Sequence, residues 1–159
     1  MKICIVRHGS AETGADADEL RSLTEKGFQQ AQGAGRWIQS LITEQQLADD
    51  VLICHSPYLR AQQTADAVIN ATGKPGQQCD LITPQGDVTQ ILDWLVAQER
   101  DIVLVSHLPL VGRLAAKLVE GQVFDQPWSP AEAWLLEGDI AASGCMTVTG
   151  VWYPALEEL

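Results

Sequence analysis

Residues Ile3 to Ala11 read I-C-I-V-R-H-G-S-A, and this stretch decides the fold. It begins with four apolar residues without alternation, which is typical of a strand buried on both faces of a sheet. Arg7 and His8 follow, where the strand is expected to end. Successive strand residues point to opposite faces, so these two side chains can address one ligand only if the chain leaves strand geometry there. Gly9 permits such a departure, and we therefore expect a ligand site at this strand end.

Strand-like runs and helix-like stripes alternate along most of the remaining chain. Apolar runs cover residues 51–54 and 102–105, and a short one lies at Leu81 and Ile82. Stripes with helical spacing separate these runs, and the first stripe comprises Phe28, Ala31, Gly35, Ile38 and Ile42. The alternation predicts an α/β fold in three layers, a sandwich with a mostly parallel central sheet covered by helices.

Local signals mark the ends of three predicted helices. Ser56 as N-cap, with Pro57 at the first helical position, is expected to open one helix. Asp87 is expected to open the next as its N-cap, and Gly121 lies just beyond the end of the last.

The C-terminal part has a different pattern. Residues 133–136 and 146–153 are strand candidates joined by a loop that contains glycine and serine, with no helix between them. We expect them to form an antiparallel addition at the edge of the sheet. Residues 121–130 are loop-like and are assigned to no element. A chain of 159 residues has an ordinary size for one domain, so residues 1–159 are expected to form a single domain.

Charge and cysteine usage exclude several classes of protein. The formal net charge of −11 and a pI near 4.5 disfavour nucleic acid as a partner, because its phosphate backbone would be repelled. The four cysteines lie far apart without a C-x-x-C pair, which argues against a disulfide framework and a zinc site. No apolar run approaches the roughly 18 residues of a membrane helix, and the first residues lack a signal-peptide core. We expect a cytoplasmic protein with no membrane partner and no bound metal.

Residues that carry chemistry recur at three strand ends. Arg7 and His8 follow the first run, H-S-P-Y-L-R with Arg60 follows the second, and His107 follows the third. Each of these residues alone has an ordinary structural explanation. Because the carboxyl ends of parallel strands meet at one edge of the sheet, the four side chains are predicted to converge there.

Arg60 indicates which ligand such a site would take. It is expected about one turn into its helix, where a positive charge opposes the helix dipole and costs ~0.3–1 kcal/mol if exposed. The same position is favourable when the guanidinium faces a bound anion such as phosphate. Arg21, in the segment R-S-L-T, either reaches the same anion or lies in solvent, and His55 is expected only to border the pocket.

Three segments resemble the motifs of the histidine phosphatase superfamily: R-H-G at residues 7–9, S-P-Y-L-R-A-Q-Q-T-A at 56–65 and S-H-L-P-L-V-G at 106–112. The match covers most of the chain in order. Within the superfamily, the short length, R-S-L-T-E-K-G at 21–27 and T-P-Q-G-D-V at 83–88 resemble the SixA-type phosphohistidine phosphatases.

The resemblance implies a covalent mechanism that needs no cofactor and no metal. His8 would attack phosphorus through a neutral ring nitrogen, and water would then hydrolyse the phosphohistidine that forms. A histidine with an ordinary pKa of about 6.5 is readily kept neutral by cationic neighbours. Arg7, Arg60 and His107 would bind the non-bridging oxygens, and Arg21 is a further candidate for binding phosphate.

The leaving group decides the substrate class. Expelling an alkoxide from a phosphoester needs a proton donor, whereas the P–N bond of phosphohistidine breaks more easily. Many superfamily members that act on phosphoesters carry a glutamate after the second motif, but residues 81–88 of this chain read L-I-T-P-Q-G-D-V. The candidate acids are Asp87, whose expected role is the helix cap, and Glu12.

The resemblance therefore points to a phosphorylated histidine-phosphotransfer (HPt) domain, or a similar phosphocarrier protein, as the partner. No long insertion would form a lid, which suits a phosphohistidine displayed on a protein surface. Two alternatives stay open. One is a phosphomonoesterase or mutase that acts on a small metabolite with Asp87 or Glu12 as the acid. The other is a non-catalytic module that binds phosphoproteins, although such a module would not need His8 as a nucleophile.

Overall fold

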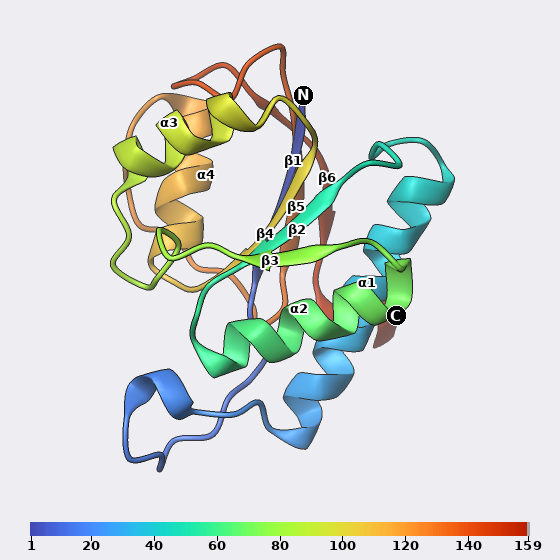
Figure 1. The fold of residues 1–159 in the computed structure, drawn as a ribbon, viewed down its shortest axis with the longest axis vertical. Coiled ribbons are helices and arrows are strands. Elements are labelled where there is room, and N and C mark those ends of the chain that lie inside the picture. The colour runs from blue at the N-terminus through green and yellow to red at the C-terminus, as the bar shows by residue number, and fades with distance from the viewer. Residues whose placement is uncertain (159) are drawn as a thin grey trace.

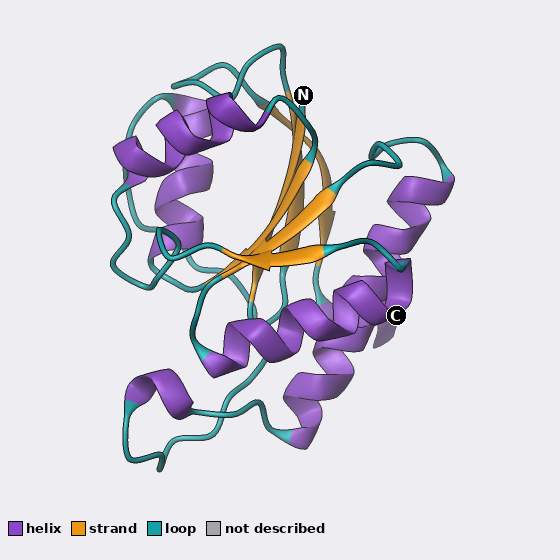
Figure 2. Cartoon of the chain, viewed as in Figure 1, coloured by secondary structure: helices purple, strands orange, loops and turns teal. Residues whose placement is uncertain are grey.

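A computed structural model describes residues 1–158 and contains one six-stranded sheet with the order β3-β2-β4-β1-β5-β6 (Figures 1 and 2). The strands are β1 (Lys2–Arg7), β2 (Leu52–His55), β3 (Gly76–Gln78), β4 (Ile102–Ser106), β5 (Ala133–Glu137) and β6 (Thr147–Trp152). Strands β3, β2, β4 and β1 pair in parallel, β5 pairs antiparallel with β1, and β6 pairs antiparallel with β5. The predicted α/β fold, with a mostly parallel sheet and an antiparallel addition at its edge, is confirmed.

Helices cover both faces of this sheet. Within the described residues there are four α-helices, α1 (Glu25–Thr43), α2 (Leu59–Thr72), α3 (Val88–Gln98) and α4 (Leu110–Glu120), and two short 3-10 helices, η1 (Asp18–Leu20) and η2 (Pro154–Glu158). Helices α1 and α2 lie on one face, and α3 and α4 lie on the other (Figure 1). The chain therefore forms the three layers that the alternating pattern predicts.

Strand β1 shows why an unbroken apolar run predicts a central strand. Ile3 and Ile5 belong to the core cluster beside α3 and α4, whereas Cys4 and Val6 belong to the cluster beside α1 and α2. All four side chains are fully buried. Burial of apolar surface is favourable by roughly 25 cal/mol per Å², so a strand that is apolar on both faces is most stable at the centre of the sheet.

The helix predicted to open at Ser56 and Pro57 begins later, at Leu59, with Tyr58 as its N-cap residue. The Ser56 hydroxyl accepts a hydrogen bond from the Tyr58 amide at 3.2 Å and lies 2.7 Å from His107 Nε2. The prediction of Ser56 as the N-cap is wrong because this hydroxyl contacts a histidine from another strand end and the turn that precedes the helix.

Two further sequence-based assignments are wrong. The chain turns at Leu81 and does not form a strand there, and the edge strand β3 consists of Gly76–Gln78 instead. This strand is polar and exposed, so it carries no apolar signal. Phe28, predicted in the buried stripe of α1, is exposed, since Gly27 takes the buried position in that turn.

The loop after β1 packs directly on the first turn of α1. A Cβ atom at Gly9 would collide with the Gly27 backbone, and one at Gly27 would collide with the Ser10 carbonyl oxygen. Neither glycine has a positive φ. Glycine is therefore required at both positions because the two backbones approach closely. The conformational freedom that we expected to matter at Gly9 is not the reason. Thr24, the N-cap of α1, ties the two segments together, because its amide donates to the Ser10 carbonyl at 2.9 Å.

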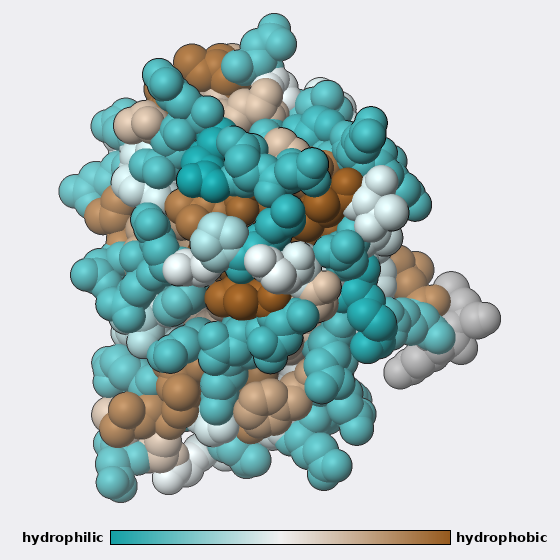
Figure 3. Space-filling view, turned by 45° about the vertical axis from the view of Figure 1, so that its right-hand side comes forward, coloured by the Kyte–Doolittle hydropathy of each residue, from teal (hydrophilic) through white to brown (hydrophobic). Residues whose placement is uncertain are grey.

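None of the helices in residues 1–158 is long and apolar enough to cross a membrane. The face drawn in Figure 3 is mostly hydrophilic, and its hydrophobic residues lie in separate small patches. Cys4, Cys54 and Cys79 are buried, Cys145 is exposed, and all four are free thiols.

Two predicted helix ends are confirmed. Asp87 is the N-cap of α3, and its Oδ1 accepts a hydrogen bond from the Gln90 amide at 3.2 Å. Gly121 ends α4 with a φ of +80°, a conformation that glycine adopts without strain. The Asp87 carboxylate is thus engaged in helix capping.

Replacing Asp87 with alanine should lower the free energy of unfolding by about 0.5–2 kcal/mol, because the first turn of α3 loses its capping acceptor. Asp87→Asn keeps an acceptor at the same place and should retain most of the stability. Chemical denaturation of the three proteins measures the difference. Equal stability of Asp87→Ala and the wild type would show that the cap contributes nothing.

Candidate active site

A pocket of about 360 Å³ opens at the carboxyl edge of the parallel strands. It is lined by Arg7, His8, Gly9, Ser10, Ala11, Arg21, Arg60, Leu108 and Pro130. Volume alone does not distinguish it, since a groove between α1 and α2 measures about 390 Å³. Its lining distinguishes it, because three arginines and one histidine from segments far apart in the sequence meet there.

His8 follows β1 and is held by the backbone on both sides. Its amide donates to the Ser106 carbonyl at the end of β4 at 2.9 Å, and its carbonyl accepts from the Ala131 amide at 3.0 Å. In the ring, Nδ1 lies 2.6 Å from the Gly9 carbonyl oxygen. A carbonyl oxygen only accepts, so Nδ1 carries the proton and Nε2 of the neutral ring keeps its lone pair. The backbone thus selects the tautomer in which Nε2 has a lone pair available for nucleophilic attack.

Electrostatics also keep the His8 ring neutral. Burial is the largest cause that lowers its pKa, from 6.5 to about 4, and the positive charges of Arg60, Arg7 and Arg21 lower it further against the opposing effect of the Gly9 hydrogen bond. Arg60 Nε donates to His8 Nε2 at 3.3 Å, so the positively charged guanidinium lies next to the lone pair of this nitrogen. The ring is therefore neutral at physiological pH.

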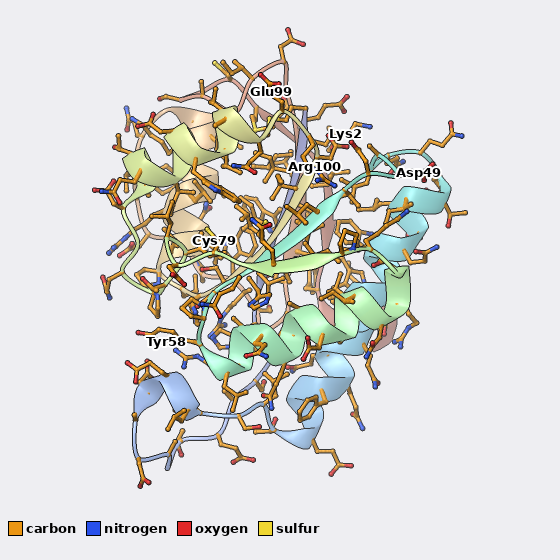
Figure 4. All side chains as sticks on the ribbon, in the orientation of Figure 1. Lys2, Asp49, Tyr58, Cys79, Glu99 and Arg100 are labelled. Carbon is orange, nitrogen blue, oxygen red and sulfur yellow. The ribbon has the colours of Figure 1, made fainter. Side chains whose placement is uncertain are left out.

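Arg60 is the second residue of α2, earlier than the full turn expected, and it is only 3% exposed. Its Nη1 donates to the Asp18 backbone carbonyl at 2.7 Å, and its Nη2 donates to the Asp18 carboxylate at 3.2 Å. The ring of Tyr58, labelled at the start of α2 in Figure 4, lies 5.0 Å from the guanidinium carbon. Burial lowers the pKa of Arg60 and the Asp18 charge opposes this. The guanidinium is held in place by contacts with His8, Asp18 and Tyr58.

Asp18, in η1, is a site residue that sequence reasoning missed. Its Oδ2 pairs with Arg60 while its Oδ1 accepts from Arg21 Nε at 2.9 Å, and Arg21 Nη1 donates to the Glu12 carbonyl at 3.2 Å. Burial acts to raise the Asp18 pKa, but the two arginines lower it overall. Asp18 therefore links two arginines as a carboxylate. Arg21 lies in the pocket lining, the first of the two positions left open by its sequence context.

Arg7 ends β1 and is anchored by the segment that sequence reasoning left unassigned. Its Nη1 donates to the Trp128 backbone carbonyl at 2.7 Å, and its backbone amide donates to the Glu132 carbonyl at 2.9 Å. Burial lowers the pKa of Arg7, and the buried Glu132 carboxylate opposes this. Trp134 Nε1 donates to that carboxylate at 2.7 Å. Glu132 offsets part of the charge of Arg7, and no short motif around it would have identified it.

His107 follows β4 and is 1% exposed. Its ring centroid lies 5.2 Å from that of His8 and 5.0 Å from that of Tyr58, both in edge-to-face arrangements. Its Nε2 is in hydrogen-bond contact with Ser56 Oγ at 2.7 Å. Burial is the largest cause that lowers the His107 pKa to about 2, followed by His8 and the arginines, so this ring is also neutral.

Two buried nitrogen atoms of the site, Arg7 Nε and His107 Nδ1, have no hydrogen-bond partner among the described residues. Native structures leave few such atoms, and each costs about 1–3 kcal/mol. A ligand that supplies oxygen acceptors would satisfy both. This observation supports an oxyanion as the ligand of the pocket.

His107 is not among the residues that line the pocket and lies behind His8, and the remaining candidates also lie outside the lining. His55 ends β2, and its Nδ1 lies 2.9 Å from the Ser56 carbonyl oxygen. Asp87 and Glu12 are not among the lining residues either. Within residues 1–158, no three His, Cys, Asp or Glu side chains are grouped closely enough to hold a metal ion.

Comparison with known proteins identifies the family. The sequence profile of the histidine phosphatase superfamily (branch 1) matches residues 3–83. The chain belongs to this superfamily. It is 34% identical over 128 residues to the phosphohistidine phosphatase SixA of Escherichia coli (strain K12), with 77% of this chain and 76% of that protein covered. It is 35% identical over 126 residues to a phosphohistidine phosphatase SixA homolog of Haemophilus influenzae, with 74% and 77% covered.

A solved structure extends this similarity over the whole histidine phosphatase fold. The structure of the protein histidine phosphatase SixA complexed with tungstate aligns with a TM-score of 0.84 at 28% identity, and it covers 99% of both chains. The resemblance to the superfamily and to its SixA-type members is confirmed.

The His8 imidazole should take up a proton only near pH 4, because burial and three arginines lower its pKa to about 4. In the unfolded chain the same ring titrates near pH 6.5. The unfolded state therefore binds more protons between these values, and stability should fall as the pH decreases through this window. NMR titration of the ring, assigned with His8→Gln, measures the folded value. A midpoint near 6.5 would contradict the environment described for His8.

Arg60→Lys should weaken the binding of inorganic phosphate by about 10-fold or more, because one ammonium group cannot replace a fork held by both Asp18 and His8. The matched control is Arg36→Lys on α1, whose arginine is exposed and pairs with Glu157. Calorimetric titration with phosphate compares the two variants. Equal affinities would show that the guanidinium of Arg60 does not contact the anion.

Proposed function

We propose that this protein is a phosphohistidine phosphatase that acts on HPt domains or phosphocarrier proteins through a phosphohistidine intermediate at His8. The single observation that carries the proposal is the His8 ring. Its Nδ1 is bound to the Gly9 carbonyl, and its Nε2 lone pair faces a guanidinium. Cationic side chains beside a neutral imidazole suit nucleophilic attack on a phosphoryl group.

The reaction proceeds in two displacements at phosphorus. In the first, the Nε2 lone pair of His8 forms a bond to phosphorus while the P–N bond of the substrate breaks. The substrate ring, which enters protonated on its other nitrogen, leaves as neutral imidazole with the electron pair. In the second, water attacks phosphorus and gives up a proton to solvent, and the P–Nε2 bond breaks to return the lone pair to His8. The products are the dephosphorylated histidine and inorganic phosphate.

Arg60 has a specific part in the first displacement. Its Nε donates to the lone pair that must attack. A bound phosphoryl group offers this N–H a negatively charged oxygen, which is a stronger acceptor than a neutral ring nitrogen. The hydrogen bond moves to that oxygen and frees Nε2. Arg7, Arg21 and His107 bind the other oxygens as charge spreads over them during transfer.

The state of the nearby carboxylates supports a P–N bond over a P–O bond as the substrate. Asp18 is ionised between Arg60 and Arg21, so it holds no proton for a leaving group. Asp87 caps α3, and Glu12 is not part of the pocket lining. A leaving imidazole needs less help from an acid than a leaving alkoxide. Phosphohistidine is the substrate that this set of side chains can serve.

The comparisons with known proteins also support a phosphohistidine substrate. Both curated relatives are phosphohistidine phosphatases by name, and the solved relative holds tungstate, an oxyanion that resembles phosphate. The three arginines of the pocket attract such an anion locally, although the whole chain has a formal net charge of −11.

The test measures phosphate release from a phosphohistidine-bearing HPt domain and from p-nitrophenyl phosphate with the same enzyme preparation. Release from the HPt domain should be fast, and His8→Ala should abolish it because the nucleophile is lost. His55→Ala is the matched control, since it removes a histidine outside the pocket, and it should keep full activity. Trapping the enzyme in acid-free denaturant should yield phosphate bound to His8.

The carboxylate variants separate this proposal from the alternatives. Asp87→Ala and Glu12→Ala should leave release from the HPt domain unchanged. A preference for the ester, together with its loss in either variant, would favour a phosphoesterase or mutase. Binding of the phosphorylated HPt domain without phosphate release would favour a non-catalytic module. Both outcomes would overturn the proposed activity.

A further inference from the structure

Ser56 lies beside His107 at a position fixed by the backbone. Its amide donates to the Val105 carbonyl of β4 at 3.1 Å, and its side chain is fully buried. His107 comes two residues after Val105, so this hydrogen bond places the Ser56 hydroxyl next to the His107 imidazole. Ser56 Oγ and His107 Nε2 are 2.7 Å apart, which is a short hydrogen bond.

The hydrogen bonds of the Ser56 hydroxyl determine the direction of this contact. A serine hydroxyl has one proton to donate and two lone pairs to accept with. The Tyr58 amide donates to one lone pair at 3.2 Å. Among residues 1–158, His107 Nε2 is the one remaining partner of the hydroxyl. If Nε2 carried a proton, the ring N–H would donate to the hydroxyl oxygen. The hydroxyl proton could then no longer donate to Nε2, and this buried proton would have no acceptor.

The opposite arrangement satisfies both groups. The hydroxyl donates to a lone pair on Nε2, and the ring proton of neutral His107 then lies on Nδ1. Nδ1 is buried and has no partner among the described residues, so an N–H is present there without an acceptor. Since Nε2 is engaged, Nδ1 is also the ring nitrogen left to contact a ligand.

We infer that Ser56 is a positioning residue for His107, which fixes the tautomer with a proton on Nδ1 so that this N–H donates to the phosphoryl group. The inference rests on the proposed function, in that the phosphoryl group is the one transferred to His8. Nothing in the pattern S-P-Y-L-R indicates this role, which depends on the meeting of two strand ends.

The neutral state of His107 makes the tautomer decisive. An imidazolium would donate from both nitrogens whatever Ser56 did. Burial and the surrounding positive charge lower the pKa of His107 to about 2, so the ring has one proton to place. With that proton on Nε2, the Nδ1 lone pair would face the negatively charged oxygens and repel them. A hydrogen bond to a phosphoryl oxygen instead strengthens as charge develops on it.

The first experiment determines the tautomer of His107 in the wild-type protein near neutral pH. Long-range ¹H–¹⁵N correlation spectra distinguish the two ring tautomers, and the three histidines can be assigned with His8→Gln and His55→Gln. We expect the proton on Nδ1 of His107, and we expect its signal to shift when tungstate is added. A proton on Nε2, or no shift with tungstate, would overturn the inference. Neither readout depends on turnover, so failure of the proposed activity is distinguishable.

The second experiment removes the hydroxyl. Ser56→Ala should lose the preference for the Nδ1 proton and lower kcat for the phosphorylated HPt domain by about 10- to 100-fold, with a smaller change in KM. The matched control is Ser106→Ala, which removes an equally buried hydroxyl that donates to the Ile82 carbonyl at 2.6 Å. It should keep the His107 tautomer. An unchanged tautomer in Ser56→Ala would contradict the inference, and if that variant fails to fold, the wild-type spectrum decides.

Discussion

The site depends on the parallel pairing of β1, β2 and β4 and on the register in which these strands end. Arg7 of β1 pairs with Ser106 of β4. The main-chain hydrogen bonds continue one residue beyond the strands, from the His8 amide to the Ser106 carbonyl and from the Ser56 amide to the Val105 carbonyl. Segments far apart in the sequence are therefore brought side by side by the backbone. The interactions between side chains described above are possible because these hydrogen bonds place the residues first.

Positive charges gathered at this edge need to be held without being neutralised. Each arginine of the pocket donates to a backbone carbonyl: Arg7 to Trp128, Arg60 to Asp18 and Arg21 to Glu12. A carbonyl orients a guanidinium but leaves its full charge. Two carboxylates, Asp18 and Glu132, offset part of the charge, so three cations face two anions and an excess of positive charge remains. The pocket therefore attracts an anion.

The side chains at the strand ends could be predicted from the sequence, whereas their supports could not. His8 and Arg60 follow apolar runs, and the topology of parallel strands brings such ends together. Asp18 lies in a 3-10 helix without periodicity, and the Trp128 contribution is a carbonyl that any residue could supply. Ser56 has the sequence context of a helix cap, but the nearby His107 changes its role. Local patterns indicate local structure, and these supports are set by contacts between distant segments.

The same logic gives different arrangements to two histidines whose ring centroids lie 5.2 Å apart. Burial and positive neighbours lower both pKa values far enough that neither His8 nor His107 is charged at physiological pH. A difference in charge therefore cannot distinguish the two rings. The hydrogen-bond partner of one nitrogen in each ring must decide which nitrogen carries the proton. A carbonyl acceptor on Nδ1 of His8 leaves a lone pair on Nε2. In the arrangement inferred for His107, a hydroxyl donor on Nε2 leaves a proton on Nδ1. In the proposed mechanism, one ring would present an electron pair to phosphorus and the other an N–H to oxygen, which is the pairing that transfer of a phosphoryl group requires.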